Sequence, residues 1–208
     1  MSHSLDLILK PEFTQKFKEG FPLITKDIFT DFNALQDEGT LLNIFDTKHN
    51  FIARGYYGIQ NKGFGWILTL QKSEMINTHF FAKIINSAIE YRADFYADKH
   101  TTAFRVLNGE GDGLGGLTID YFDGYYLFTW YSLGIYEFKE QILEAFKLSV
   151  EYKGVYQKKR FDNKGKYLNE KDDFLFGNNA PVPLIVKENS VNFAIYLDDG
   201  AMVGVFLD

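Results

Sequence analysis

A glycine-rich segment is the first part of the sequence whose spacing could support chemistry. Gly111, Gly113 and Gly116 match the G-x-G-x-x-G pattern with which dinucleotide-binding proteins let backbone N–H groups approach a pyrophosphate. That use requires a helix directly after the glycines, because the start of the helix supplies free N–H groups. Residues 117–121 are instead typical of a strand, and two acidic residues inside the segment would repel phosphates. The pattern therefore favours a tight loop between strands, in which glycines supply positive φ angles.

A run of cations is the first candidate for binding a nucleic acid. Lys158, Lys159 and Arg160 lie in the most basic stretch of the chain, residues 153–171, which holds seven cations and two carboxylates. Ammonium and guanidinium groups of this kind can neutralise phosphates. A solvated loop is the alternative interpretation of the same run.

A second candidate lies in the segment 53–57, where a cation stands next to two aromatic residues on an expected strand. Arg54 and Tyr56 are suited to contact single-stranded RNA, because bases stack on aromatic rings and on guanidinium groups. An ordinary pair of sheet residues is the alternative at these two positions.

No catalytic or metal-binding set emerges from the spacing of the other residues. The four histidines are widely scattered, and none stands four residues from another, so they propose neither a metal site nor a hydrolytic triad. Cysteine is absent, which excludes disulfides, thiolate metal sites and a cysteine nucleophile from these 208 residues. We therefore assign no catalytic, cofactor-binding or metal-binding residue to this chain.

The composition limits the class of protein. A net charge of −6, from 22 cations and 28 carboxylates, excludes a globally basic coat for nucleic acid but leaves room for local patches. A hydrophobic fraction of 46% with 17% aromatic residues is typical of a folded chain with more than one core. No apolar run approaches the roughly 18 residues needed to cross a bilayer, and the start lacks a secretory signal. We expect a cytoplasmic protein without a membrane partner.

The elements that must position these residues change character along the chain. Residues 1–72 are typical of short strands around one short helix at 11–18, which predicts a compact β-barrel. A joining helix is expected within 73–102, with Asn77 or Thr78 as its cap. Its expected buried face consists of Phe81, Ile84, Ile85, Ala88, Tyr91 and Phe95.

The remaining residues predict a second layer. Strands alternate with a loop, a turn and a helix over 103–180, which predicts a central α+β domain with a mostly antiparallel sheet. Asp123 and Gly124 are typical of a two-residue hairpin turn. Another hairpin is expected in 181–208, around a turn at 187–190. The sequence then stops in an apolar segment, which we interpret as a truncation of a longer protein.

Taken in order, these segments resemble the bacterial SAM-dependent ribosomal RNA large-subunit methyltransferases of type I. The most specific block is Phe104-Arg105-Val106 followed by EGDGLGGLTID at 110–120, which is similar to the family pattern Y-R-L-x-x-x-E-x-D-G-L-P-G-L-x-I-D. The other segments that carry the resemblance are Pro22, Ala53 to Tyr56, Ser73 to Asn77, Phe80-Phe81, Val155-Tyr156 and Gly200 to Asp208.

The sequence departs from the family pattern at two places. Gly115 stands where the family commonly has Pro, which we expect to loosen the loop. Met202 and Val203 replace a common Lys-Thr pair, so a contact made by that pair is not expected here.

The resemblance implies an α+β architecture: a PUA-like RNA-binding barrel at 1–72, a central domain, and a hairpin at 181–208 that leads to a Rossmann-like methyltransferase domain outside the chain. It also implies that the parent enzyme uses S-adenosylmethionine to methylate carbon 5 of a cytosine in 23S ribosomal RNA. Such chemistry ordinarily requires a nucleophile, usually a cysteine thiolate, so a chain without cysteine is not the catalyst and binds no cofactor. Ribosomal RNA and the missing domain are the expected partners, and homodimerisation is left open.

We therefore expect this chain to bind and orient RNA, with Arg54, Tyr56, Lys158, Lys159 and Arg160 as the contacts. A different hypothesis is a non-catalytic RNA- or protein-binding assembly module, whose acidic and aromatic surface mediates dimerisation or docking. A third is a nucleotide-dependent enzyme that uses the glycine-rich segment.

Overall fold

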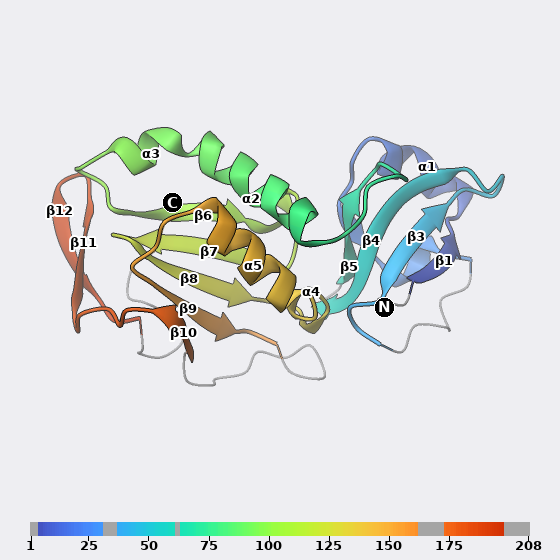
Figure 1. Ribbon diagram of the computed structural model, residues 1–208. Coiled ribbons are helices and arrows are strands. Elements are labelled where there is room, and N and C mark those ends of the chain that lie inside the picture. Colours follow the sequence, from blue (N-terminus) through green and yellow to red (C-terminus); the bar gives the residue numbers. More distant parts are fainter. Residues whose placement is uncertain (1–3, 31–36, 61–62, 162–172, 198–208) are drawn as a thin grey trace.

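The computed structural model describes residues 4–30, 37–60, 63–161 and 173–197, which form two large sheets and a separate hairpin (Figure 1). The first sheet has the order β1-β3-β4-β5-β2, in which β1 runs parallel to β3 and the other neighbours are antiparallel. Its strands are β1 (Ser4–Ile8), β2 (Leu23–Ile24), β3 (Leu41–Phe45), β4 (Phe51–Gln60) and β5 (Gly63–Thr69).

One helix and a buried apolar cluster complete this first layer. Helix α1 (Pro11–Lys18) has Pro in its first turn, where a missing N–H removes no intrahelical bond, and it buries Phe17. A short 3-10 helix, η1, spans Lys26–Ile28. The cluster includes Leu9, Phe17, Ile24, Leu42 and Ile44. The helix predicted at 11–18 is confirmed.

The joining segment contains two helices, α2 (Thr78–Tyr91) and α3 (Ala93–Ala97). The side chain of Asn77 accepts a hydrogen bond from the backbone N–H of Phe80 at 3.0 Å, so Asn77 is the N-cap, as one of the two alternatives predicted. The buried residues of α2 include Phe81, Ile85 and Ala88, which also lie on the predicted face.

The prediction for the end of this helical face is wrong. Tyr91 and Phe95 are 84% and 50% exposed, although their spacing continues the apolar stripe. Arg92 separates α2 from α3 with φ −109° and ψ 18°, so the helical phase is broken there. Phe95 follows this break and so no longer shares the face of the residues before it, whereas Tyr91 is the last residue of α2.

The second sheet has the order β10-β9-β8-β7-β6 and is antiparallel except between β8 and β9. The mostly antiparallel sheet predicted for this region is confirmed. Its strands are β6 (Ala103–Asn108), β7 (Leu117–Phe122), β8 (Tyr125–Trp130), β9 (Gly154–Lys159) and β10 (Asp173–Gly177).

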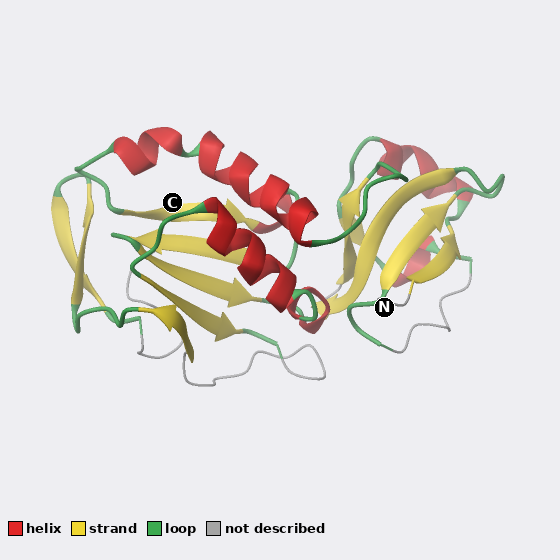
Figure 2. Cartoon of the chain, in the orientation of Figure 1, coloured by secondary structure: helices red, strands yellow, loops and turns green. Residues whose placement is uncertain are grey.

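Helices cover one face of this sheet. The parallel pair β8 and β9 requires a crossover, which α4 (Leu133–Tyr136) and α5 (Lys139–Ser149) provide. Figure 2 shows α2 and α5 side by side over the same face, and the two helices contact each other. At the β7–β8 turn, Asp123 and Gly124 have φ angles of 46° and 93°, the two positive values that a type I′ turn needs. The predicted hairpin turn is confirmed.

A separate hairpin, β11 (Leu184–Glu188) and β12 (Val191–Ile195), lies at the end of the sheet that is far from the first layer (Figure 1). It turns at Asn189 and Ser190, within the turn predicted at 187–190. The inner side chains of the hairpin pack on the sheet through the cluster Ala103, Phe122, Tyr125, Leu127, Tyr156, Leu184, Val186, Ile195 and Leu197.

The two large sheets share one hydrophobic core. Leu41, Tyr56, Trp66 and Leu68 from the first sheet belong to the same cluster as the residues beneath α2 and α5. Within the described residues, no helix is both long enough and apolar enough to span a bilayer. The domain boundaries expected at residues 72, 102 and 180 stay a prediction.

Candidate functional site

Arg54 uses its guanidinium to hold the protein together. Its Nε donates to Oδ1 of Asn43 at 2.8 Å, and its two terminal nitrogens donate to the carbonyl oxygens of Glu74 and Lys72. These bonds join β3 and β4 to the segment that leads into α2. Arg54 thus positions the start of the joining helix, and its contact with RNA stays a prediction.

Tyr56 lies in the core, which corrects its expected role. Its side chain is fully buried, and its ring stacks on Trp66 with 5.7 Å between centroids. The ring of Phe138 packs on it in an edge-to-face arrangement with 6.2 Å between centroids. Its hydroxyl donates to the carbonyl of Gly115 at 2.7 Å, and burial holds the pKa of Tyr56 well above its usual value. An enclosed ring offers no surface on which a base could stack, and the described geometry gives Tyr56 the role of connecting the two sheets.

The basic run does not form one continuous patch. Lys158 is only 4% exposed, whereas Lys159 and Arg160 are half-buried. Lys159 places its ammonium 5.8 Å from the ring centroid of Tyr136, on the crossover side of the sheet. Lys158 pairs in register with Thr129 and, because side chains alternate along a strand, points to the opposite face. Arg160 directly follows β9, and its backbone N–H donates to the carbonyl of Trp130 at 2.7 Å, which extends the same alternation to Arg160.

Lys153, at the start of the basic stretch, is engaged with Asp123. Its ammonium lies 2.8 Å from the carboxylate and donates to the carbonyl of the same residue. Lys164, Lys166 and Lys171 lie outside the described residues. Of the predicted run, Arg160 is the cation that is both partly exposed and on the sheet face away from the helices.

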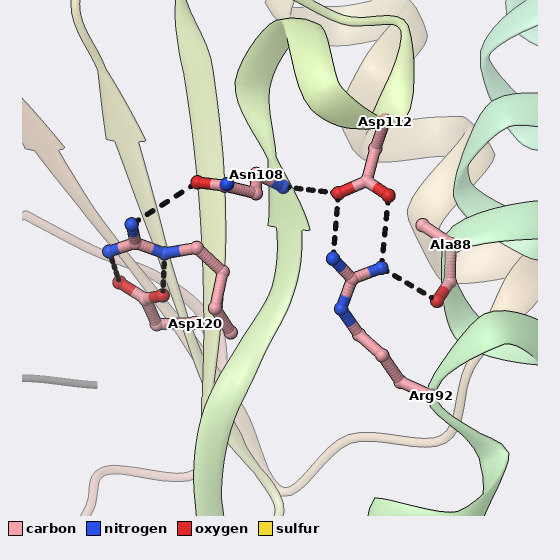
Figure 3. A network of polar contacts seen from close by, with 6 residues as sticks. Ala88, Arg92, Asn108, Asp112 and Asp120 are labelled. Carbon is pink, nitrogen blue, oxygen red and sulfur yellow. Dashed lines mark hydrogen bonds and ion pairs between the residues drawn. The ribbon is translucent and has the colours of Figure 1, made fainter. Parts of the chain in front are cut away.

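The glycine-rich segment forms a loop that is fixed from two sides (Figure 3). It begins with a short 3-10 helix, η2 (Gly109–Asp112), and leads into strand β7, so it lacks the following helix that a dinucleotide site needs. The carboxylate of Asp112 accepts two hydrogen bonds from Arg92 at 3.0 and 2.8 Å and a third from the backbone N–H of Asn108. Asp112 therefore anchors the loop to the end of α2.

A second ion pair supports the other side of the same loop. Nε of Arg105 lies 2.8 Å from the carboxylate of Asp120, and Nη1 of Arg105 reaches the side chain of Asn108 (Figure 3). Burial raises the pKa of Asp120, and the neighbouring guanidinium of Arg105 acts in the opposite direction. The pair lies on the sheet face away from the helices and joins β6, the strand before the loop, to β7, the strand after it.

A cleft of about 420 Å³ opens where the end of β4 meets this loop and the sheet behind it. Sequence reasoning missed this site because its residues come from three separate segments of the chain. The one signal that could have drawn attention to it is Thr118, a polar residue between the apolar Leu117 and Ile119 of β7. The lining residues are Gln60, Asn108, Gly109, Glu110, Gly111, Gly116, Leu117, Thr118 and Tyr131.

The chain is similar to a known domain family and to named methyltransferases. The family profile of the PUA-like domain matches residues 7–70, which confirms the fold expected for the first layer. The chain is 47% identical over 204 residues to a Bacillus subtilis protein named as the ribosomal RNA large subunit methyltransferase YwbD, covering 97% of this chain and 51% of that protein. The homologues of this chain are ribosomal RNA large-subunit methyltransferases. The predicted resemblance is confirmed.

More distant methyltransferases show the same coverage. Ribosomal RNA large subunit methyltransferase I of Alteromonas mediterranea is 25% identical over 99% of this chain and 52% of its own length. A structure assigned as a SAM-dependent methyltransferase from Streptococcus mutans matches with a TM-score of 0.86 and 30% identity, covering 98% of this chain and 51% of that one. A second structure, of a methyltransferase complexed with SAH, matches with a TM-score of 0.84. The chain thus spans about half the length of the methyltransferases it matches.

The described residues do not fit the cofactor of these methyltransferases. The glycine-rich loop leads into a strand, and Glu110 places a negative charge beside it. Its other acidic side chain, Asp112, is occupied by Arg92. No described group of His, Asp and Glu is arranged to hold a metal ion. We derive no step of methyl transfer through these residues.

The departure from the family pattern at Gly115 has a structural reason. A Cβ atom at this position would lie 2.1 Å from Cδ1 of Trp66, closer than any real contact. The indole therefore occupies the space that a proline would need, and the loop is tightly packed, which corrects the expectation that glycine loosens it. Met202 and Val203 lie outside the described residues.

Proposed function

We propose that this chain binds and orients ribosomal RNA for a SAM-dependent methyl transfer that another part of the protein catalyses. The observation that carries the proposal is the 47% identity, over 97% of the chain, to a protein named as a ribosomal RNA large subunit methyltransferase. The PUA-like match at residues 7–70 supports a role in binding RNA. Since the substrate is ribosomal RNA, the proposal places the protein in the cytoplasm.

The target of the proposed reaction is carbon 5 of a cytosine in 23S ribosomal RNA. Methylation at this carbon ordinarily needs a nucleophile that adds to carbon 6, and a cysteine thiolate usually provides it. This chain has no cysteine, so the proposal assigns the nucleophile and S-adenosylmethionine to the part of the protein that these 208 residues do not include. The chain's own contribution is affinity for RNA and the position of the RNA.

The test combines methylation with binding. The protein as purified from its own cells is incubated with radiolabelled S-adenosylmethionine and with 23S ribosomal RNA from a strain that lacks the gene. Mass spectrometry of RNA fragments should then locate one methyl group on carbon 5 of a cytosine. A methyl group on another base would overturn the cytosine-5 assignment, and the absence of transfer to any ribosomal RNA would overturn the proposal as a whole.

A role in assembly is the second candidate, because several large apolar side chains are exposed. Met75 and Val182 are each 71% exposed, and Ile185 and Val191 on the hairpin are 51% and 58% exposed. Such residues can form a contact with a second copy or with the rest of the protein. Light scattering over a range of concentrations should show a rising mass if the chain forms a homodimer, and a constant mass of 24.0 kDa would contradict this.

A further inference from the structure

Two residues that line the cleft each carry a buried polar atom with no hydrogen-bond partner among the described residues. These atoms are Oε1 of Gln60 and Oγ1 of Thr118, and both are shielded from solvent. Native proteins pair nearly all of their buried polar groups, and an exception calls for an explanation such as a ligand. Gln60 offers a carbonyl acceptor, and Thr118 offers a hydroxyl that both donates and accepts. The lining of the cleft thus contains two polar atoms whose hydrogen-bonding capacity the described residues do not use.

An aromatic ring completes the lining. Tyr131 follows β8 directly, and its backbone N–H donates to the carbonyl of Gly116 at 2.8 Å, which fixes it beside the glycine-rich loop. Its side chain is partly exposed and contributes to the cleft. A phenol ring in this position can stack on a flat ligand.

Charge selects which part of a nucleotide could enter. Glu110 is exposed and lines the cleft, so it opposes the entry of a phosphate group. The nearby guanidinium of Arg105 is already paired with Asp120. The volume of about 420 Å³ falls in the range of small-molecule sites. A flat, uncharged group with hydrogen-bonding edges fits these conditions.

A cation for the sugar-phosphate backbone lies at the border of this region. The backbone N–H of Arg160 donates to the carbonyl of Trp130 at 2.7 Å, which continues the β8–β9 ladder and puts Arg160 next to Tyr131. By the alternation of the strand, Arg160 faces the same side of the sheet as Thr118 and Thr129. A phosphate outside the cleft would meet this guanidinium while the base lies inside.

We propose that this cleft binds one unstacked nucleobase of single-stranded RNA, between the ring of Tyr131 and the polar edges of Gln60 and Thr118. The inference rests on the proposed function, because it takes ribosomal RNA as the ligand. It adds a site at the junction of the PUA-like region and the second sheet. Single-stranded RNA is the form whose bases are free to stack on aromatic rings and to expose their hydrogen-bonding edges.

The experiment measures fluorescence anisotropy of the chain with labelled ten-nucleotide RNAs of cytidine, adenosine or uridine. Tyr131→Ala should weaken binding about tenfold, because it removes the stacking surface, whereas the matched control Tyr131→Phe should change it less than about twofold. Thr118→Val should weaken binding about three- to tenfold, since it removes the hydroxyl and keeps the shape. The thermal midpoint of Thr118→Val should stay equal or rise, because the variant removes no hydrogen bond seen among the described residues.

Distinct outcomes separate this inference from the function on which it rests. If the chain binds RNA and both Tyr131→Ala and Thr118→Val bind it as tightly as the wild type, the cleft is not the base site while the proposed function stands. If Thr118→Val lowers the thermal midpoint together with affinity, its hydroxyl has a structural role and the inference fails. If the wild-type chain binds none of the RNAs at low salt, the proposed function of the chain fails as well.

Discussion

The hydroxyl of Tyr56 joins the two sheets through one buried hydrogen bond to Gly115. The residue type suits RNA stacking, yet the ring lies between Trp66 and Phe138 in the shared core. A phenol placed there combines a large apolar surface with one polar atom that finds a partner. Tyr56 therefore serves mainly to hold the two sheets together.

Replacing this hydroxyl should cost stability without a direct effect on RNA. Tyr56→Phe leaves the buried carbonyl of Gly115 without its donor, and we expect a loss of about 1–3 kcal/mol in the free energy of unfolding. Urea unfolding measures the loss. Tyr125→Phe is the matched control, because its hydroxyl makes a longer hydrogen bond of 3.4 Å to a carbonyl. Unchanged stability with weaker RNA binding would restore Tyr56 as a contact residue.

A second residue-scale prediction concerns pH. Burial raises the pKa of Tyr96 from 10.0 to about 12. Between these values the unfolded chain has lost a proton that the folded chain keeps, so the free energy of unfolding should fall as the pH rises from 10 towards 12. Urea unfolding at pH 8 to 11 should show this fall, and Tyr96→Phe should reduce it. Tyr91→Phe, at an exposed position, is the control and should show the same fall as the wild type. If the free energy of unfolding falls equally in Tyr96→Phe and in the wild type, the assignment to Tyr96 is contradicted.

At the scale of elements, the glycine-rich loop connects three parts of the molecule. Asp112 holds it to the end of α2, Asn108 links it to the Arg105–Asp120 pair, and Gly115 packs under Trp66 of β5. Through these contacts the loop fixes the joining helix, the second sheet and the PUA-like region relative to one another. The cleft depends on this arrangement, because several of its lining residues come from the loop.

The packing of Gly115 against Trp66 predicts a strong effect of added volume. Gly115→Ala should lower the free energy of unfolding by about 1–3 kcal/mol, because the new Cβ would overlap the indole. Gly111→Ala is the matched control, since the nearest atom to its Cβ would be 3.9 Å away. Combining Gly115→Ala with Trp66→Leu should recover part of the loss in a double-mutant cycle. Additive effects in that cycle would show that the two residues do not compete for space.

How far the sequence predicts these elements depends on the range of the interactions involved. The cap at Asn77 and the turn at Asp123-Gly124 rest on neighbours in the chain, and both are correctly predicted. The burial of Tyr56 and Lys158 depends on segments far away in the sequence, so local patterns do not predict it. The placement of Lys158 and Lys159 on opposite faces of the sheet is predictable in principle, because consecutive side chains alternate between the two faces of a strand.

At the scale of the whole molecule, RNA affinity must overcome a net charge of −6. Local cations can still bind phosphates, and each phosphate bound on a single strand contributes about 0.7 to the slope of log affinity against log salt concentration. The described structure singles out Arg160 for this role, with Lys159 on the other face and Lys158 buried.

Reversing the charge at position 160 tests this role. Arg160→Glu should weaken the binding of single-stranded RNA and reduce the salt slope by about 0.7 for each phosphate that is no longer neutralised. Lys99→Glu, at an exposed position between α3 and β6, makes the same change in net charge and serves as the control. Titrations at several salt concentrations supply both slopes. Equal weakening by the two variants would show a general charge effect instead of a specific interaction.

The shared core also limits how evolution can recombine this protein. A gene segment that ended near residue 72 would encode the PUA-like region with Leu41, Tyr56, Trp66 and Leu68 stripped of the partners that bury them. Apolar surface of that size favours aggregation unless a new partner covers it. Transfer of the PUA-like region alone from one protein to another is therefore disfavoured. We expect the PUA-like region and the second sheet to be inherited together.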